Sequence, residues 1–388
     1  MASRSGYIPT LDGWRAVAII AVLFAHTHLL ALPGRLGRHL AIYLWSNGGV
    51  RGVDIFFAIS GLLICSRLLD EEVRFGHISL KNFYIRRAFR ILPPALLFLL
   101  VLALLHLFGP IPLSPLDWFS SLFFFRNYTV TLSGPPLSWW FTSHFWSLSV
   151  EEQFYLFLPA LLIFLPRWRL RALLAIALLS TIWKLYVTHF LHLDVETTYI
   201  WLHYHTGGCI DALLIPAAVA VYMHKPDGEH LLSRWLTSNV RLFLVVPVAA
   251  WVFYRFSPWP MAKLAAPLLI LATVYNPKSF VGLFLESAPL RWIGRLSYSL
   301  YVWQELFLCT RFPVQPPLGR IQMFPYNMVC LLACACLSYY LVERPMIRIG
   351  HSLTRSSYVP SESNPAPRSF PHPFRCRSHA SSRDQYVP

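Results

Sequence analysis

Charge is scarce in this chain of 388 residues. Asp, Glu, Lys and Arg make up 13% of it, about half of the ~25% that is usual in soluble globular domains. Hydrophobic residues make up 56%. These few charges could not cover the surface of a water-soluble enzyme of this length, and the apolar content excludes a disordered scaffold. The composition therefore indicates a protein that resides in a membrane.

Cysteine is present in a pattern that gives no recognisable site. The seven cysteines are odd in number, and no two of them have the C-x-x-C spacing that is typical of zinc or redox sites. Six of them lie in apolar runs, where we interpret them as small buried hydrophobic residues. The sequence therefore predicts no metal site and no disulfide framework.

Long apolar runs divide the chain into candidate membrane spans. A spanning helix needs about 20 mostly apolar residues, and its backbone polar groups must be satisfied within the helix. We therefore expect an all-α polytopic membrane protein with about ten transmembrane helices, of which the seventh, eighth and tenth are short or broken by proline. They cover residues 14–32, 50–69, 91–109, 146–165, 171–190, 207–223, 242–257, 260–276, 293–311 and 325–343. The predicted membrane domain spans residues 1–348, and a disordered basic tail rich in Ser and Pro follows at 349–388.

The positions of Lys and Arg predict the orientation of the chain. Most of the 33 Lys and Arg residues fall in alternate loops, and such residues are retained on the cytoplasmic side. Both termini are therefore predicted to be cytoplasmic. The same distribution accounts for the net charge of +15 without a nucleic-acid partner. The longest external loop, residues 110–145, carries several Phe and Trp residues, including Trp139 and Trp140, and is expected to lie at the membrane interface.

Ionisable residues inside the spans are functional candidates because lipid makes them costly. Arg15 and His26 lie on the first run, roughly 16 Å apart along a helix, with Arg15 at the cytoplasmic edge. Asp54, Glu151 and Glu152 enter from the outside on two other runs and are expected at the depth of His26. A carboxylate beside an imidazole fixes its tautomer, as a general base requires. The alternatives are a membrane anchor, a packing hydrogen bond, and acids that offset a helix dipole.

Three arginines stand in the internal loop that precedes the third run. Arg86 and Arg90 are spaced i, i+4 and Arg87 is i, i+3 from Arg90, so a helix could direct all three at one anion. Guanidinium groups suit phosphate because their paired N–H donors match its oxygens. A lipid-headgroup or topology role is the alternative.

Five motifs in a fixed order give the chain a resemblance to a known family. They read LDGWR at 11–15 followed by His26, GVDIFFAISG at 52–61, RRAFRI at 86–91, WSLSVEEQFY at 146–155 and SYSLY at 297–301. Over residues 7–348 the chain resembles the membrane acyltransferase 3 family. Members are integral-membrane O-acyltransferases that modify bacterial surface polysaccharides and other extracytoplasmic or lipophilic acceptors.

The resemblance implies roles for the polar residues. Arg15 and His26 correspond to residues regarded as essential in the family, and the internal arginines to those linked with the acyl donor, usually acetyl-CoA. We therefore expect acyl-CoA as a donor substrate, no tightly bound cofactor, and a glycan or other hydroxyl-bearing acceptor, in a bacterial inner membrane. His26 is predicted to accept the acceptor's proton, supported by Asp54 and by Glu151 or Glu152. One departure is Gln304, which stands where members often carry His.

Two other classes of function remain open at this stage. The intramembrane charges could serve a transporter of a polar solute, or the chain could be an inactive relative that only binds a partner. The absence of an internal repeat and the clustering of arginines on one loop favour the enzyme.

Overall fold

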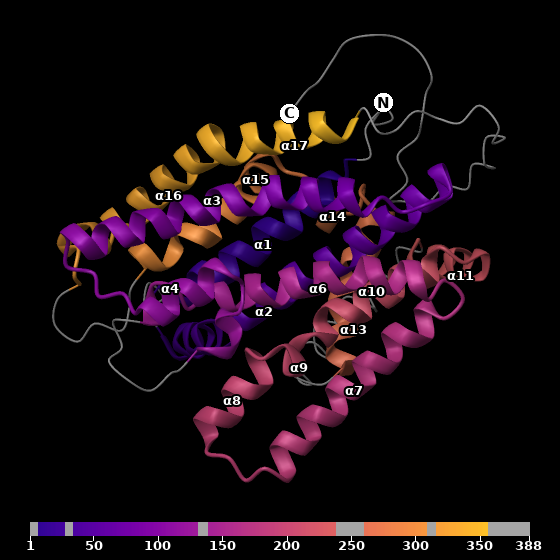
Figure 1. Cartoon of the computed structure of the whole chain (residues 1–388), viewed down its shortest axis with the longest axis horizontal. Coiled ribbons are helices and arrows are strands. Elements are labelled where there is room, and N and C mark those ends of the chain that lie inside the picture. Colours follow the sequence, from indigo (N-terminus) through magenta and orange to yellow (C-terminus); the bar gives the residue numbers. More distant parts are fainter. Residues whose placement is uncertain (1–6, 28–33, 131–138, 238–259, 309–315, 356–388) are drawn as a thin grey trace.

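The computed structural model describes residues 7–27, 34–130, 139–237, 260–308 and 316–355, and all the regular structure in these ranges is helical (Figure 1). Five of the described helices are long and apolar enough to cross a membrane, so the chain is an all-α membrane protein, as predicted. They are Gly48–Phe75, Leu80–Phe108, Phe145–Phe164, Arg169–His189 and Tyr326–Thr354.

The described elements follow one another in a simple order. They are α1 (Pro9–Ala25), α2 (Gly34–Phe75), α3 (Leu80–Phe108), α4 (Pro115–Leu122), η1 (Arg126–Tyr128), α6 (Phe145–Phe164), α7 (Arg169–His189), α8 (Val195–His203), α9 (Thr206–Cys209), α10 (Asp211–Met223), α11 (Pro226–Leu236), α13 (Pro260–Tyr275), α14 (Phe280–Leu285), α15 (Ala288–Phe307), η2 (Gly319–Gln322), α16 (Tyr326–Ser338), the π-helical turn η3 (Tyr339–Glu343) and α17 (Arg344–Arg355).

The predicted apolar runs coincide with these helices wherever the structure describes them. The seventh run, residues 242–257, lies outside the described residues, and the total of ten spans stays a prediction. The last run is longer than predicted because α16, η3 and α17 continue without a break to Arg355. The first seven residues of the predicted tail are therefore helical, and the rest of it lies outside the described residues.

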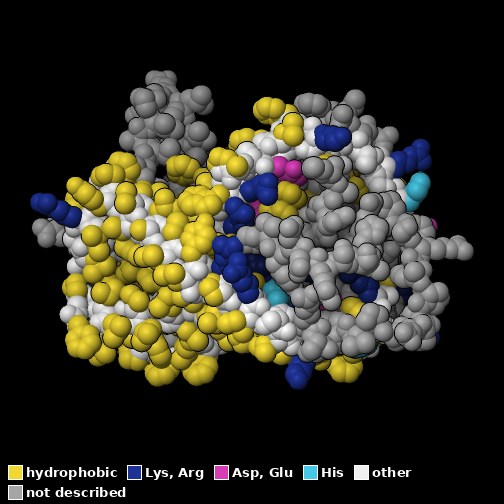
Figure 2. Space-filling model, turned by 90° about the horizontal axis from the view of Figure 1, so that it is seen from above, with side chains coloured by type: hydrophobic (Ala, Val, Ile, Leu, Met, Phe, Trp, Pro, Cys, Tyr) yellow, Lys and Arg dark blue, Asp and Glu magenta, His cyan; other side chains and the backbone are white. Residues whose placement is uncertain are grey.

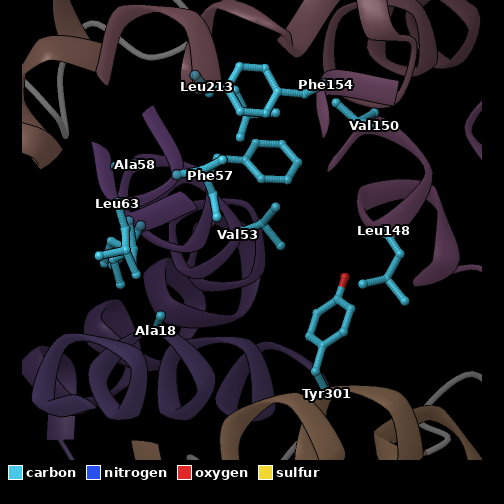
Figure 3. Packing of buried hydrophobic residues seen from close by; sticks show 14 of the residues in the cluster. Ala18, Val53, Phe57, Ala58, Leu63, Leu148, Val150, Phe154, Leu213 and Tyr301 are labelled. Atoms are coloured by element: carbon cyan, nitrogen blue, oxygen red, sulfur yellow. The ribbon is translucent and has the colours of Figure 1, made fainter. Parts of the chain in front are cut away.

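The helices pack as a row, with α1 and α2 near its middle. α7 packs on α10, α10 on α2, α2 on α1, α1 on α15 and α15 on α16, while α17 lies along α3 (Figure 1). Side chains of α2 fill the centre between α1, α6, α10 and α15 (Figure 3). The buried residues in this view include Ala18, Val53, Phe57, Ala58, Leu63, Leu148, Val150, Phe154, Leu213 and Tyr301.

One end of the bundle is basic. Arg15 near the start of α1 and Arg90 in the first half of α3 line the same cavity, and Gly350 near the end of α17 packs on Phe89. α1 thus begins and α17 ends at the same end of the molecule, as expected when both termini share one side of the membrane. Figure 2 shows a broad hydrophobic surface bordered by a row of Lys and Arg side chains, as is typical where a membrane protein leaves the bilayer.

Glycines allow the central helices to approach closely. A Cβ at Gly52 would lie 2.5 Å from the carbonyl oxygen of Ala18, and one at Gly61 would lie 2.3 Å from that of Leu213. Backbone atoms cannot move aside as a flexible side chain does. α2 therefore needs glycine at both positions to contact α1 and α10, in line with the role of small residues in membrane helix packing.

We expect Gly61→Ala to destabilise the protein by about 1–3 kcal/mol, because the added methyl group meets backbone. Gly49→Ala is a matched control, since its Cβ would meet side-chain atoms rather than backbone: the Cβ of Ala25 at 3.3 Å and Cε1 of His26 at 3.8 Å. Thermal unfolding of the two purified variants in detergent measures the difference. Equal melting temperatures for both variants would contradict the close contact between α2 and α10.

Candidate active site

A partly open cavity lies between α1, α2, α3, α6 and α15, with about 790 Å³ of empty space when the open solvent at its mouth is included. Arg15, Arg87 and Arg90 line it near the basic end, and apolar side chains of α2 and α6 form much of its wall. Ser147 and Tyr301 are also part of its lining. We call this space the arginine cavity. It combines a cluster of fixed positive charge with an apolar channel, which suits a ligand that has an anionic head and a long neutral arm.

The structure brings together two of the three predicted loop arginines. Arg87 and Arg90 line the arginine cavity, whereas Arg86 donates to Oε2 of Glu71 at 3.1 Å. Neighbouring residues on a helix point about 100° apart, so Arg86 and Arg87 cannot share one direction. The third arginine that lines the cavity is Arg15 of α1 rather than Arg86.

Two partly buried carboxylates balance the arginine cluster. Glu151 accepts hydrogen bonds from the Ser60 and Tyr155 hydroxyls, and the Arg87 guanidinium lies 5.3 Å from the centre of the Tyr155 ring. Glu152 interacts electrostatically with Glu151 and Arg87. Both glutamates therefore belong to the arginine cavity and its surroundings.

Glu343 is a second source of negative charge that the sequence reasoning missed. It is 2% exposed on η3 and accepts a hydrogen bond of 2.7 Å from the Ser299 hydroxyl. Its carboxylate interacts electrostatically with Arg90 and Arg15. In the sequence, Glu343 could have been noticed as a glutamate inside the last apolar run. In the structure it lies in the π-helical turn η3.

His26 ends α1 at the far side of the bundle from the basic end. Its Nδ1 lies 2.8 Å from the carbonyl oxygen of Val22, and its Nε2 lies 3.9 Å from Oε1 of Glu305. A carbonyl oxygen can only accept, so in the neutral ring Nδ1 carries the hydrogen and Nε2 keeps the free lone pair. The ring is 24% exposed and is therefore accessible.

Glu305 is the centre of the polar groups around His26. Its buried carboxylate accepts hydrogen bonds from the Ser143 hydroxyl at 2.8 Å and from the backbone N–H of His144 at 3.2 Å. The Nδ1 atom of His144 lies 2.8 Å from the same carboxylate, and Trp140 donates to the Glu305 carbonyl oxygen at 3.2 Å. We call His26, His144 and Glu305 the histidine layer.

The acidic partner of His26 is therefore Glu305, rather than Asp54, Glu151 or Glu152 as the sequence reasoning expected. His144 immediately precedes α6, so Glu151 lies about two turns, roughly 10 Å, farther along that helix toward the basic end. Asp54 is on α2 and pairs with Nζ of Lys263 at 2.5 Å. Glu305 could have been found as a carboxylate inside an apolar run four residues after the SYSLY motif.

The arginine cavity and the histidine layer are joined by direct contacts. Tyr301 donates to the carbonyl oxygen of His144 at 3.0 Å, and its hydroxyl lies 2.6 Å from Oγ of Ser147. The Tyr301 and His144 rings lie 5.6 Å apart. Glu305 follows Tyr301 by one helical turn, so a single face of α15 contributes to both regions.

A buried arginine fixes the segment that carries His144. Arg126 is fully buried, lies 3.2 Å from Asp117, and donates to the Trp139 carbonyl and the Thr142 hydroxyl at 3.2 Å each. Burial raises the pKa of Asp117, and the neighbouring Arg126 opposes this shift. Trp139 and Trp140, expected at the membrane interface, are instead buried beside the histidine layer. The exposed aromatic residues of this loop lie on and just after α4.

No set of three or more His, Cys, Asp or Glu side chains within the described ranges is arranged to hold a metal ion.

The chain belongs to the acyltransferase 3 family, since the family's sequence model, described as an acyltransferase domain, matches residues 8–344. The resemblance seen in the motifs is thereby confirmed.

Among its relatives, the peptidoglycan O-acetyltransferase OatA of Listeria monocytogenes serovar 1/2a is 28% identical over 89% of this chain and 56% of that protein. The O-acetyltransferase OatA of Staphylococcus aureus is 31% identical over 89% of this chain and 58% of its own length. The putative peptidoglycan O-acetyltransferase YrhL of Bacillus subtilis is 29% identical, with 91% and 57% covered. The chain spans a little over half the length of these relatives. No solved structure matches it.

The buried pair of Asp54 and Lys263 gives a test of the role of Asp54. We expect Lys263→Met to destabilise the protein by about 1.5–3 kcal/mol, because it removes a charge-assisted hydrogen bond from the buried Asp54 carboxylate while Arg51 stays 3.8 Å from it. Combining it with Asp54→Leu should recover part of this loss, since the two residues interact directly. Thermal unfolding of both single variants and the double variant in detergent measures the coupling. If the stability losses of the two single variants simply added up in the double variant, Asp54 would not act through its pair with Lys263.

Proposed function

We propose that this chain is an O-acyltransferase that moves an acyl group, such as acetyl, from acyl-CoA to a hydroxyl of a polysaccharide across the membrane. The observation that carries the proposal is the contact between the arginine cavity and the histidine layer through Tyr301 and Ser147. The similarity to peptidoglycan O-acetyltransferases supports O-acetylation and peptidoglycan as the acceptor.

The arginine cavity fits the chemistry of coenzyme A. Arg15, Arg87 and Arg90 provide guanidinium groups for its phosphates. These arginines lie at the end of the cavity that is predicted to face the cytoplasm, from which acyl-CoA would enter. The apolar wall, which includes Phe57 and Leu63, would receive the pantetheine arm. The thioester would then be the leading end of the donor and point toward the histidine layer.

His26 has the geometry of a general base for the acceptor hydroxyl. Its Nε2 lone pair would take the hydroxyl proton while the hydroxyl oxygen bonds to the thioester carbon. The carbon–sulfur bond then breaks, and the leaving thiolate takes the proton from the imidazolium. Glu305, 3.9 Å from Nε2, would stabilise the imidazolium between these steps. The polysaccharide would approach from the external side.

The donor site is tested by comparing neighbouring arginines. We expect Arg87→Ala to weaken binding of acetyl-CoA at least about tenfold, because a charge-assisted phosphate contact is lost. Arg86→Ala is the matched control, since Arg86 pairs with Glu71 outside the cavity, and it should change affinity less than about threefold. Calorimetric titration of each purified variant gives the affinities. Equal losses in both variants would place the phosphates elsewhere.

The base is tested by acyl transfer in membranes that contain the polysaccharide acceptor and radiolabelled acetyl-CoA. We expect His26→Gln to lower the transfer rate by roughly 10²–10⁴-fold at unchanged donor affinity, since only proton transfer is removed. Glu305→Gln should lower the rate less, and His77→Gln, an exposed site at the basic end, should not change it. Full transfer by His26→Gln at equal protein level would rule out His26 as the base.

A further inference from the structure

Tyr301 lines the arginine cavity at the end nearest the histidine layer. Tyr301 is 6% exposed and extends from α15 across the gap toward Leu148 of α6 (Figure 3). It is part of the cavity lining together with Leu148 and Ser147. Anything that advances along the cavity from the arginines therefore meets the Tyr301 ring before it reaches Glu305 or His26.

The Tyr301 ring is held in place from several sides. Its hydroxyl donates to the carbonyl oxygen of His144 and lies 2.6 Å from Oγ of Ser147, so that Ser147 donates to it. Phe56 contacts one part of the ring edge-to-face at 6.2 Å, and the His144 ring contacts it at 5.6 Å. These contacts fix both the position and the tilt of the ring. A side chain fixed in this way cannot turn aside without losing two hydrogen bonds.

The direction of the donor makes this wall important. With the phosphates at the arginines, the acyl group is the leading end of the molecule, and the thioester carbon has to reach the acceptor oxygen beside His26. Any carbon atoms beyond the carbonyl need space on the histidine side of the cavity. The Tyr301 ring limits that space. One methylene group more or less in a filled apolar pocket changes selectivity by roughly 10–200-fold.

We propose that Tyr301, fixed by Ser147 and the His144 carbonyl, determines acyl selectivity by admitting an acetyl group and excluding chains of four or more carbons. This inference rests on the proposed acyl-CoA donor. The bonds made and broken are those of the transfer reaction above, and Tyr301 takes no part in proton transfer. It acts as a specificity-determining residue through its shape and its fixed position.

The test compares acetyl-, butyryl- and hexanoyl-CoA as donors for the full-length protein in membranes. The measured quantity is the ratio of kcat/KM for butyryl-CoA to that for acetyl-CoA. Tyr301→Ala is expected to raise this ratio by at least about tenfold, because the wall is removed. Tyr301→Phe should give an intermediate ratio, since the ring remains but both hydrogen bonds are lost. Tyr186→Ala, at an exposed tyrosine on α7, should leave the ratio unchanged.

The outcomes separate this inference from the proposed function. Transfer of acetyl by the wild type with an unchanged ratio in Tyr301→Ala would overturn the role of Tyr301 and leave the acyltransferase proposal intact. Absence of transfer from every acyl-CoA by the wild type would overturn both. If Tyr301→Ala does not fold, Tyr301→Leu replaces it, since leucine keeps an apolar side chain but leaves the outer part of the ring's space empty. An unchanged ratio in that variant would equally overturn the inference.

Discussion

The buried carboxylate of Glu305 is the interaction on which the site depends. An ion inside a membrane protein is costly unless hydrogen bonds replace its water, and Glu305 receives them from a hydroxyl, a backbone N–H and an imidazole. All three come from the turn before α6, so satisfying Glu305 fixes that turn against α15. Arg126 holds the same turn from the opposite side. His26 then faces the Glu305 carboxylate, and the groups that fix the position of this carboxylate do not include His26.

With the proposed function, this arrangement would let one protein bring together ligands from two sides of a membrane. The donor cavity needs positive charge, and the base needs a nearby negative charge, so the two regions must be kept apart. Charges only a few ångströms apart in a medium of low dielectric constant would pair with each other instead. The structure separates them by about two turns of α6 and gives each its own counter-charge, with Glu151 and Glu343 near the arginines and Glu305 near His26.

The sequence was sufficient to predict where helices form and how far apart residues of the same helix lie. Apolar run length determines where a span can form, and the fixed rise of a helix places Arg15 and His26 roughly 16 Å apart along α1. The sequence could not show which acid faces His26, because that depends on how α15 packs against α1. That packing is set by backbone contact: a Cβ at Gly294 would lie 1.8 Å from the carbonyl oxygen of Asp12. The expected depth in the membrane therefore favoured Asp54 as the acidic partner of His26. In the structure Asp54 faces α13 instead.

Placing Tyr301 and Glu305 one turn apart on α15 would link the proposed acyl selectivity to the proposed catalysis. The two side chains share a helix face, and both are anchored to His144, one through its carbonyl oxygen and the other through its ring and N–H. A longer acyl group that displaced Tyr301 would strain the same residue that positions Glu305. Donors that fit poorly should thus lose rate at the chemical step as well as affinity. Substrate size and base position are governed by a single local structure because His144 is common to both.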